Sequence, residues 1–351
     1  MTKINLKGFK KMRKSKILKI LAIALASLLA AVLIFFAVIN LIPPKANVEN
    51  NPFIVEDGAL PMVAAHRGGG VSNPENTMLA FREAVKTIKV DIIESDLYLT
   101  KDGYLVYNHD SYIDRTSNVN GDLSPDEVDA LCEDKANRHY ISDMTLAELE
   151  QYNFGYYFED KNGERIYKDV ENFAELGLQI ATVEKLFEEF YESHPDLLFI
   201  VEIKDDGERG YEACRILYET LERYPVYKDR IVVGTFHDEI EQELKEKYPS
   251  LLRGAPTGTA AKFVITQYLG VNLFDESDFA CLQIPMSYDV GIELSLTAQT
   301  LVDRAHKRNI AVQYWTINDA DDMRTLIEMG VDCIMTDDPE LLQSVLDEYR
   351  K

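Results

Sequence analysis

Cysteine is scarce in this chain of 351 residues, and its spacing fits no metal-binding or redox motif. The four cysteines are Cys132, Cys214, Cys281 and Cys333, and no two of them form a CxxC pair. Zinc-ribbon and thioredoxin-like proteins are therefore excluded. Cys281 and Cys333 lie in apolar runs, where we expect small buried core residues. One disulfide outside the cell is an open alternative, because the spacing does not identify which two cysteines would pair.

Basic side chains are scarce outside the first 19 residues. Residues 1–19 carry eight of the 37 lysines and arginines and no acidic residue. The remainder sets 29 basic side chains against 60 acidic ones, a net charge of −31, and the whole chain has a net charge of −23. A generic nucleic-acid binder needs a basic face and is excluded. Hydrophobic and charged residues, at 46% and 28%, exclude wholesale disorder.

Polar side chains are absent from residues 20–39 except for Ser27. A helix of these 20 residues spans about 30 Å, the thickness of a bilayer core. The run is longer than a signal-peptide core and no A-x-A cleavage site follows, so we expect an uncleaved membrane helix over residues 20–42. A cleaved signal peptide and a buried helix are the alternatives. The flanking charges predict a basic cytoplasmic arm at residues 1–19 and a body outside the cell, joined by a linker at residues 43–60.

Residues 61–351 alternate between short apolar runs and amphipathic stretches, which is typical of an α/β protein with a parallel sheet. Eight runs are expected to be parallel strands, the number that closes a (β/α)8 TIM barrel. These runs are residues 62–66, 90–97, 198–203, 231–236, 251–255, 280–284, 310–317 and 331–335.

One further strand, residues 104–108, follows its neighbour after only a short turn containing Asp102-Gly103. A parallel return needs a dozen or more residues, so this strand is expected to form an antiparallel hairpin outside the barrel count. The pattern loosens over residues 115–178, which we interpret as a small insertion on the barrel rim.

Barrel enzymes carry their chemistry at the carboxyl ends of the strands, so the polar residues there are the candidates. They are His66, Arg67, Glu94, Asp96, His109, Glu202, Lys204 and Trp315. Taken singly, a strand-end histidine is usually structural and a Glu-x-Asp pair is usually solvated or salt-bridged. Glu202 lies in an apolar strand, where a carboxylate must be paired or must bind a metal. Three carboxylates, as oxygen ligands, suit Ca²⁺ or Mg²⁺ rather than zinc.

Motifs along the body resemble the glycerophosphodiester phosphodiesterase family. In order they are His66-Arg67-Gly68, Pro74-Glu75-Asn76-Thr77, Glu94-Ser95-Asp96, Lys101-Asp102-Gly103, His109-Asp110 with Asp114-Arg115-Thr116, Glu202-Ile203-Lys204, Trp315-Thr316-Ile317-Asn318 and Gly330-Val331-Asp332 to Pro339. The resemblance spans about residues 62–345. The segment before Glu202 is longer than is usual in the family, and Ile180-Ala181-Thr182-Val183 replaces the usual Ile-Pro-Thr-Leu.

The resemblance implies a role for each candidate residue. Its metal ligands, for one Ca²⁺ or Mg²⁺ ion, correspond to Glu94, Asp96 and Glu202. Its acid–base pair corresponds to His66 and His109, and its phosphate-binding cations to Arg67 and Lys204. Trp315 would face the glycerol or the leaving group. Glu75 is expected to orient the metal site or His66, and Asn76 is expected to cap the following helix or to support the site.

The implied activity is the metal-dependent hydrolysis of glycerophosphodiesters to an alcohol and glycerol 3-phosphate. Two alternatives stay open. One is a lysophospholipase D or phosphatidylinositol-type phosphodiesterase acting on lipids, and the other is an inactive barrel that serves as a binding module. The expected partners are a small or polymeric glycerophosphodiester and, through the N-terminal helix, a membrane. Nucleic acid is not expected.

Overall fold

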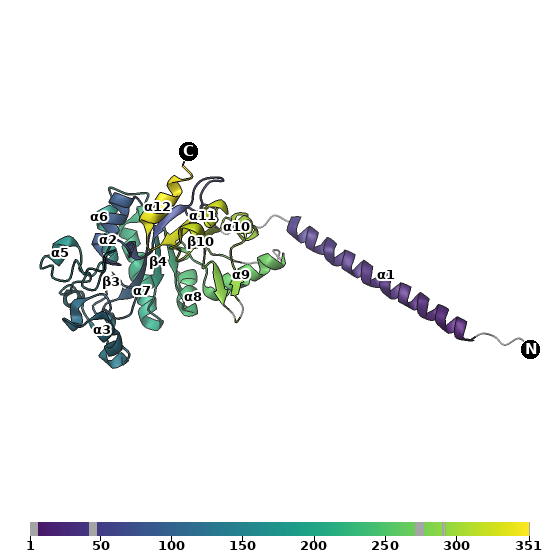
Figure 1. Cartoon of the computed structure of the whole chain (residues 1–351), viewed down its shortest axis with the longest axis horizontal. Coiled ribbons are helices and arrows are strands. Elements are labelled where there is room, and N and C mark those ends of the chain that lie inside the picture. Colours follow the sequence, from purple (N-terminus) through teal and green to yellow (C-terminus); the bar gives the residue numbers. More distant parts are fainter. Residues whose placement is uncertain (1–5, 42–47, 271–276, 290, 292, 351) are drawn as a thin grey trace, which may run out of the picture.

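The computed structural model describes residues 6–41, 48–270, 277–289, 291 and 293–350. Helix α1 (Leu6–Leu41) projects from one end of the body, and its span Lys16–Ile39 is long and apolar enough to cross a membrane (Figure 1). Almost none of this span is buried against the rest of the chain, which fits a segment whose partner is lipid. The helix begins at Leu6 rather than near residue 20, so the basic arm is helical over most of its length. Residues 42–47, where we expect the helix to end, lie outside the described residues.

The body is a parallel barrel of eight strands that is nearly closed. The strands are β1 (Met62–Ala65), β2 (Ile92–Leu99), β4 (Leu198–Ile203), β5 (Ile231–Gly234), β6 (Leu252–Arg253), β7 (Cys281–Ile284), β10 (Ala311–Tyr314) and β11 (Cys333–Thr336). They pair in the order β6-β5-β4-β2-β1-β11-β10-β7, and a parallel bridge from Gly254 to Cys281 joins the two edges. The eight strands predicted from the apolar runs are confirmed.

Helices cover the outside of the barrel because each has one apolar face that must leave water. They are α2 (Met78–Arg82), α6 (Val183–Phe190), α7 (Gly207–Arg223), α8 (Asp238–Lys247), α9 (Thr257–Leu269), α10 (Gln299–His306), α11 (Ala320–Glu328) and α12 (Pro339–Asp347). A π-helical turn, Glu83–Ile88, continues α2. Large apolar residues of these helices and of the strands form two clusters between the sheet and the helix layer.

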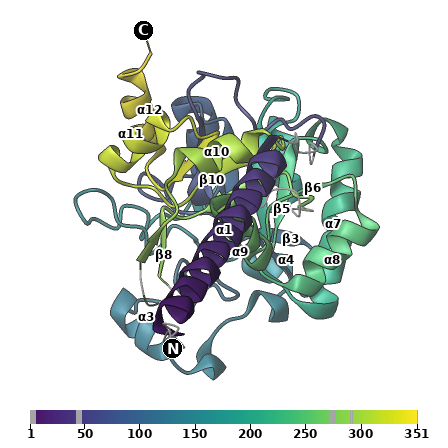
Figure 2. The same ribbon diagram turned by 90° about the vertical axis from the view of Figure 1, so that its right-hand side faces the viewer.

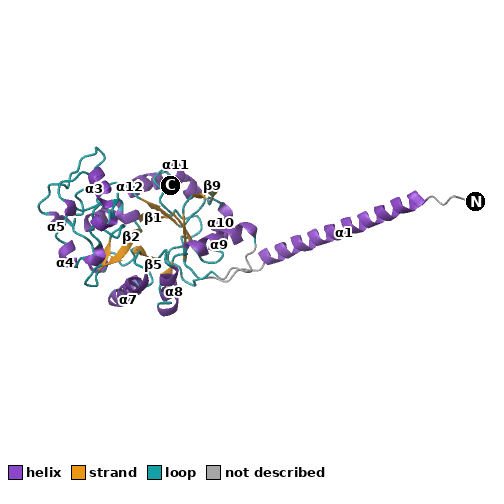
Figure 3. Ribbon diagram, turned by 90° about the horizontal axis from the view of Figure 1, so that it is seen from below, coloured by secondary structure: helices purple, strands orange, loops and turns teal. Residues whose placement is uncertain are grey.

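Two hairpins and an insertion are added to the barrel and its helices. β3 (Leu105–Tyr107) pairs antiparallel with the end of β2, which confirms the predicted hairpin. The rim insertion holds α3 (Pro125–Cys132), α4 (Leu146–Leu149) and α5 (Phe173–Leu176), at the end of the body away from α1 (Figures 1 and 3). A second hairpin, β8 (Ser287–Asp289) and β9 (Glu293–Ser295), follows β7 and is not anticipated in the sequence pattern.

Residues 48–56 pack against the barrel, although they fall within the expected linker at residues 43–60. We call them the N-terminal latch. Phe53 is fully buried among residues of the barrel interior that include Ile92, Ala311 and Cys333. These partners lie at or near the starts of the strands, so the latch closes the barrel end opposite the strand carboxyl ends.

Backbone and side-chain hydrogen bonds hold the latch in place. Asn51 Nδ2 donates to the carbonyl of Asn309 at 2.9 Å, and the backbone N–H of Val55 donates to Asp332 Oδ1 at 3.0 Å. Asp332 is fully buried. Only residues 42–47 therefore separate the end of α1 from a segment fixed to the barrel.

The four cysteines are free and buried. Cys281 and Cys333 lie in the barrel interior, as predicted, and burial raises their pKa well above the ordinary value. They act as small apolar side chains in the narrow space that the strands enclose.

Candidate active site

The three carboxylates meet on two neighbouring strands. Glu94 and Asp96 lie two residues apart on β2, so both point into the barrel, and Asp96 is directly opposite Glu202 of β4 in the parallel register. Glu94 and Asp96 are 6% and 3% exposed, and Glu202 is half-buried. Strand alternation and register are therefore enough to bring these carboxylates to one place.

Two cations lie against the carboxylates. Lys204 follows β4 and places Nζ 3.0 Å from Asp96 Oδ1 and 2.7 Å from Glu202 Oε1. Arg67 follows β1; its backbone N–H donates to Glu94 Oε2 at 3.0 Å, and its Nε lies 3.8 Å from Asp96 Oδ2. Arg67 has a φ of 52°, a strained conformation of the kind that clusters at functional sites.

The cluster holds more negative charge than its cations neutralise. Burial, reinforced by the charge of Asp96, raises the pKa of Glu94 to about 7. Burial also raises the pKa of Glu202, against the opposing effect of Lys204. Burial alone would lower the pKa of Lys204, but Asp96 and Glu202 outweigh it and the pKa is raised. A further positive charge at this position would therefore be favourable.

His66 lies at the end of β1 and is oriented by a carboxylate. Its Nδ1 is 2.6 Å from Asp337 Oδ1, and Asn318 Nδ2 donates to Asp337 Oδ2 at 2.7 Å. Because a carboxylate accepts, Nδ1 carries the proton and Nε2 faces Glu94, 3.8 Å from its Oε2. Burial would lower the pKa of His66, but Asp337 and Glu94 together raise it.

His109 follows the β3 strand and also has a carboxylate partner. Its Nδ1 is 3.1 Å from Asp110 Oδ1, and Arg115 Nε donates to Asp110 Oδ2 at 2.6 Å. Burial would raise the pKa of Asp110, but the bonds from His109 and Arg115 hold it well below the ordinary value. The His109 side chain is 37% exposed, so it faces the open side of the site. It lies near enough for its charge to act on Glu202.

Glu75 connects Arg67, beside the carboxylates, to Arg115, beside His109 and Asp110. Arg115 binds it with both terminal nitrogens, Nη2 to Oε1 at 2.6 Å and Nη1 to Oε2 at 3.1 Å, while Arg67 Nη1 approaches Oε1 at 3.5 Å. Burial would raise the pKa of Glu75, but the two arginines lower it. A continuous ionic chain therefore runs from Arg67 through Glu75 and Arg115 to Asp110 and His109.

Asn76 does not cap the helix that follows it. Thr77 is the N-cap of α2, and its side chain accepts from the backbone N–H of Ala80 at 3.2 Å. Asn76 instead adopts a left-handed φ of 58°, and its Oδ1 accepts from Ser95 Oγ. Ser95 lies between Glu94 and Asp96 on the opposite face of β2, so Asn76 contacts the strand that carries the carboxylates.

Trp315 lies at the rim rather than in the cluster. It follows β10, its backbone N–H donates to the carbonyl of Ile284 at 3.2 Å, and the residue is 38% exposed. A large apolar side chain that stays in water at the mouth is available to contact part of a substrate.

The residues present suit a hard divalent cation. Their donors are oxygens only, and Asp96 Oδ2 and Arg67 Nε are both buried without a hydrogen-bond partner. Within the described residues, however, no three His, Cys, Asp or Glu side chains converge closely enough to form a complete metal cage. Lys204 occupies the space between Asp96 and Glu202 and supplies part of the compensating charge.

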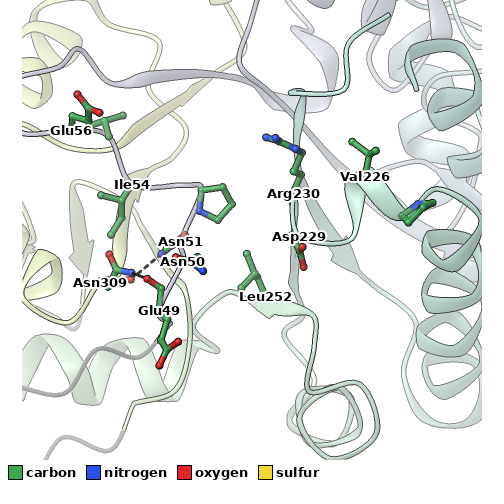
Figure 4. Close-up of a pocket in the computed structure, with 13 residues that line it drawn as sticks. Glu49, Asn50, Asn51, Ile54, Glu56, Val226, Asp229, Arg230, Leu252 and Asn309 are labelled. Carbon is green, nitrogen blue, oxygen red and sulfur yellow. Dashed lines mark hydrogen bonds between the residues drawn. The ribbon is translucent and has the colours of Figure 1, made fainter. Parts of the chain in front are cut away.

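A pocket of about 970 Å³ lies at the other end of the barrel (Figure 4). The latch and residues that precede strands, such as Arg230 before β5 and Asn309 before β10, line it. It is therefore separate from the cluster at the strand carboxyl ends.

Three residues of the site are absent from the candidates named from the sequence. They are Asp337, Asp110 and Arg115, which hold His66, His109 and Glu75. All three lie in motifs of the resemblance, and Asp337 directly follows β11.

The fold and this cluster define the class of the protein, a (β/α)8-barrel enzyme with its polar cluster at the carboxyl ends of the strands. Residues 66–341 match the glycerophosphoryl diester phosphodiesterase family. The chain belongs to this family. It is a glycerophosphodiester phosphodiesterase, a phosphoric diester hydrolase that releases glycerol 3-phosphate.

Curated relatives cover the same region. A glycerophosphodiester phosphodiesterase of Caldanaerobacter subterraneus is 28% identical over 80% of this chain and 96% of its own. One from Bacillus subtilis is 26% identical over 82% of this chain and 87% of its own.

Solved structures share the fold at lower identity. The glycerophosphoryl diester phosphodiesterase domain of a Mycobacterium tuberculosis protein has a TM-score of 0.64 at 18% identity and covers 83% of this chain and 100% of its own. An Oleispira antarctica phosphodiesterase was solved in complex with the product sn-glycerol-3-phosphate. It has a TM-score of 0.57 at 22% identity and covers 82% of this chain and 97% of its own.

Proposed function

We propose that this enzyme hydrolyses water-soluble or polymeric glycerophosphodiesters outside the cell by metal-assisted histidine acid–base catalysis. One observation supports the proposal above the others. Three carboxylates, two cations and two histidines, each histidine with a carboxylate partner, converge where the strands end.

Arg67 and Lys204 bind the phosphodiester and balance the charge that grows on its oxygens as the new P–O bond forms. Arg67 offers a fork of donors that matches two phosphate oxygens, while Lys204 offers a compact charge. Glu75 limits the freedom of the Arg67 side chain, because it pairs with Arg67 at the edge of the site.

His66 and His109 move the protons. One takes a proton from the attacking hydroxyl, either water or the substrate's own glycerol hydroxyl, and the other gives a proton to the departing alcohol. Asp337 and Asp110 hold the Nδ1 atoms, so each ring presents Nε2 to the substrate. Trp315 contacts the glycerol or the leaving group at the mouth.

Glu94, Asp96 and Glu202 would hold one Ca²⁺ or Mg²⁺ ion. Members of this family typically depend on a divalent metal. When bound, such an ion neutralises charge on the phosphate and the attacking oxygen. The raised pKa of Glu94 supports this assignment, because a buried carboxylate pair is relieved by a cation.

The acid–base assignment predicts that His66→Ala or His109→Ala abolishes release of glycerol 3-phosphate from glycerophosphocholine. Removal of a proton donor or acceptor costs about 10²- to 10⁴-fold in kcat. His194→Ala is the matched control, because His194 lies before β4, at the barrel end opposite the site, where its ring contacts Ser193 and Phe190. Full activity in both site variants, with circular dichroism unchanged, would refute the assignment.

The metal assignment predicts that exhaustive chelation abolishes turnover and that Ca²⁺ or Mg²⁺ restores it. The physical reason is the uncompensated charge of Glu94, Asp96 and Glu202. Dialysis against a chelator followed by titration with each ion measures the effect. Activity that survives chelation unchanged would show that these carboxylates serve another role.

A lysophospholipase D activity is the second candidate. A mouse lysophospholipase D is 22% identical over 82% of this chain and 83% of its own, so the barrel is compatible with a lipid substrate in a relative. A panel of glycerophosphocholine, glycerophosphoethanolamine, glycerophosphoinositol, polymeric glycerol phosphate and lysophosphatidylcholine separates the candidates. Preference for the lysolipid would overturn the proposed substrate class.

We also propose that α1 is an uncleaved anchor with its N-terminus in the cytoplasm. The length and hydropathy of Lys16–Ile39 and the eight basic residues before residue 20 support this orientation.

A further inference from the structure

The barrel end that carries the latch must stay close to the bilayer, provided that α1 is the proposed anchor. The latch is bonded to the barrel from Val48 onward, and α1 ends at Leu41. Seven residue steps separate these points, which reach at most about 25 Å when fully extended. The strand starts are therefore the end of the barrel that the tether holds nearest the membrane.

Helix α9 lies at the α1 end of the body in all three views (Figures 1, 2 and 3). It runs from the end of β6 toward the start of β7, so its last turns approach the latch end. Ile265, Tyr268 and Leu269 in these turns are 57%, 48% and 64% exposed. Their spacing of three and four residues places them on one outward stripe.

The charge of α9 differs from that of its neighbours. Its 13 residues contain no acidic side chain and one cation, Lys262, within a body whose net charge is −31. The preceding helix α8 has Asp238, Glu239 and Glu241 in its first turn, at the catalytic end of the barrel, and Lys245 and Lys247 in its last turn, toward the latch end. The outer surface of α9 can therefore approach anionic lipid without the repulsion that most of the body would meet.

We propose that the C-terminal half of α9 docks on the outer surface of the same bilayer that α1 spans. Ile265 and Leu269 enter the boundary between headgroups and acyl chains, and Tyr268 takes the interfacial position that tyrosine prefers. Lys262 lies one turn earlier and reaches lipid phosphates. A patch this small would bind weakly in free solution, but the tether keeps it at high local concentration.

Docking fixes the direction of the catalytic mouth. The mouth then opens away from the anchoring bilayer, toward diffusible or wall-bound diesters, and lipids in the same leaflet cannot reach His66 and Glu94. This inference rests on the proposed anchor and not on the chemistry of the site.

Spin labels on the full chain test the docking. The native cysteines are buried, so a label attaches to an introduced cysteine in Ile265→Cys, with Leu29→Cys in α1 and Ile166→Cys in the rim insertion as references. Each variant is placed one copy to a nanodisc of phosphatidylcholine and phosphatidylglycerol. Collisions with oxygen report lipid contact, and collisions with a water-soluble nickel chelate report water.

The ratio of the collision rate with oxygen to that with the nickel chelate is expected to be high at residue 29 and several-fold lower at residue 166. At residue 265 we expect a ratio closer to that of residue 29 than to that of residue 166. Equal ratios at residues 265 and 166, with residue 29 in lipid, would overturn the docking and leave the anchor intact. Water contact at residue 29 would overturn both. Protection of residue 265 only at high copy number, with dipolar broadening, would assign the patch to a second copy and overturn the proposal.

Discussion

Asp337 orients the His66 ring, so that Nδ1 faces Asp337 and Nε2 faces Glu94. Its Oδ1 lies 2.6 Å from Nδ1, and its Oδ2 accepts from Asn318, so the carboxylate itself is held in place. Burial would raise the pKa of Asp337, but His66 and Asn318 lower it, which keeps it ionised as a partner for a protonated ring. In the proposed mechanism Asp337 is therefore a positioning residue that acts through His66.

We expect Asp337→Asn to lower kcat by about 10²-fold, because the amide no longer fixes the Nδ1–H tautomer of His66. Asn318→Ala should cause a smaller loss, because it frees Asp337 without removing its charge. Asp337→Glu should recover part of the rate. Steady-state kinetics on glycerophosphocholine measure kcat and KM separately. A higher KM with an unchanged kcat in Asp337→Asn would contradict a positioning role.

At the residue scale, alternation predicts side chains on strands, whereas it does not separate the roles of adjacent residues that follow a strand. Glu94, Asp96 and Glu202 follow from alternation within apolar runs. The pair Asp337-Asp338 is ambiguous, because one aspartate after a strand often caps the next helix. Asp338 is that cap, accepting from the backbone N–H of Leu341 at 3.0 Å, and Asp337 is free for His66. Backbone geometry, which spacing does not reveal, makes the distinction.

Asp332 connects three elements at the latch end. Its Oδ1 accepts from the backbone N–H of Val55 in the latch. Its Oδ2 accepts from the backbone N–H of Val312 in β10 at 2.7 Å and lies 2.8 Å from Nε2 of His306, at the end of α10. The hydrogen bond from His306 to Asp332 raises the pKa of His306 above its ordinary value of 6.5, against the effect of burial and with help from Asp57 and Asp303. Protonated His306 therefore favours the folded state.

This contact predicts a pH-dependent stability difference. A raised folded pKa means that the stabilisation is fully present below the unfolded value and disappears as pH rises through the folded value. His306→Gln should lower the free energy of unfolding by about 1 kcal/mol near pH 6 and by little near pH 9. Urea unfolding of both proteins at the two pH values measures this. An equal difference at both values would show that charge is not the cause.

At the element scale the eight barrel strands are predictable because each is a compact apolar run between helical stretches. The latch is not predictable, because residues 48–56 have a loop-like composition, and the hydrogen bonds of Asn51 to Asn309 and of Val55 to Asp332 join residues more than 250 positions apart. The short exposed strands β8 and β9 leave too little pattern to recognise. Local sequence therefore specifies the barrel, and distant contacts specify what closes it.

The uneven charge of the whole molecule follows its proposed topology. The basic residues of the arm lie on the N-terminal side of the membrane span, and the acidic body lies beyond it. An anionic bilayer attracts the first and repels most of the second. The acidic body thus limits lipid contact to surfaces such as α9 that lack acid.

The topology predicts the outcome of protease treatment of intact protoplasts. External protease should remove the barrel and leave a short fragment that contains α1, while an N-terminal tag stays protected. The untreated protein should remain in the membrane fraction at its full 40.0 kDa. Release of a shorter barrel into the medium without protease would identify a cleaved signal peptide, and loss of the tag would reverse the orientation.

The latch also determines when the barrel can finish folding. Asn51 and Val55 leave the ribosome early, but their partners Asn309 and Asp332 follow 258 and 277 residues later. At about 5–20 residues per second, synthesis of the intervening chain takes about 13–55 s. During that time Asn51 and Val55 lack these two partners, and Phe53 lacks its core neighbours Ala311 and Cys333. Completion of the latch contacts is thus postponed until nearly the whole chain is made, and a nascent chain that stalls before Asp332 lacks the hydrogen bond from Val55 at the strand-start end of its barrel.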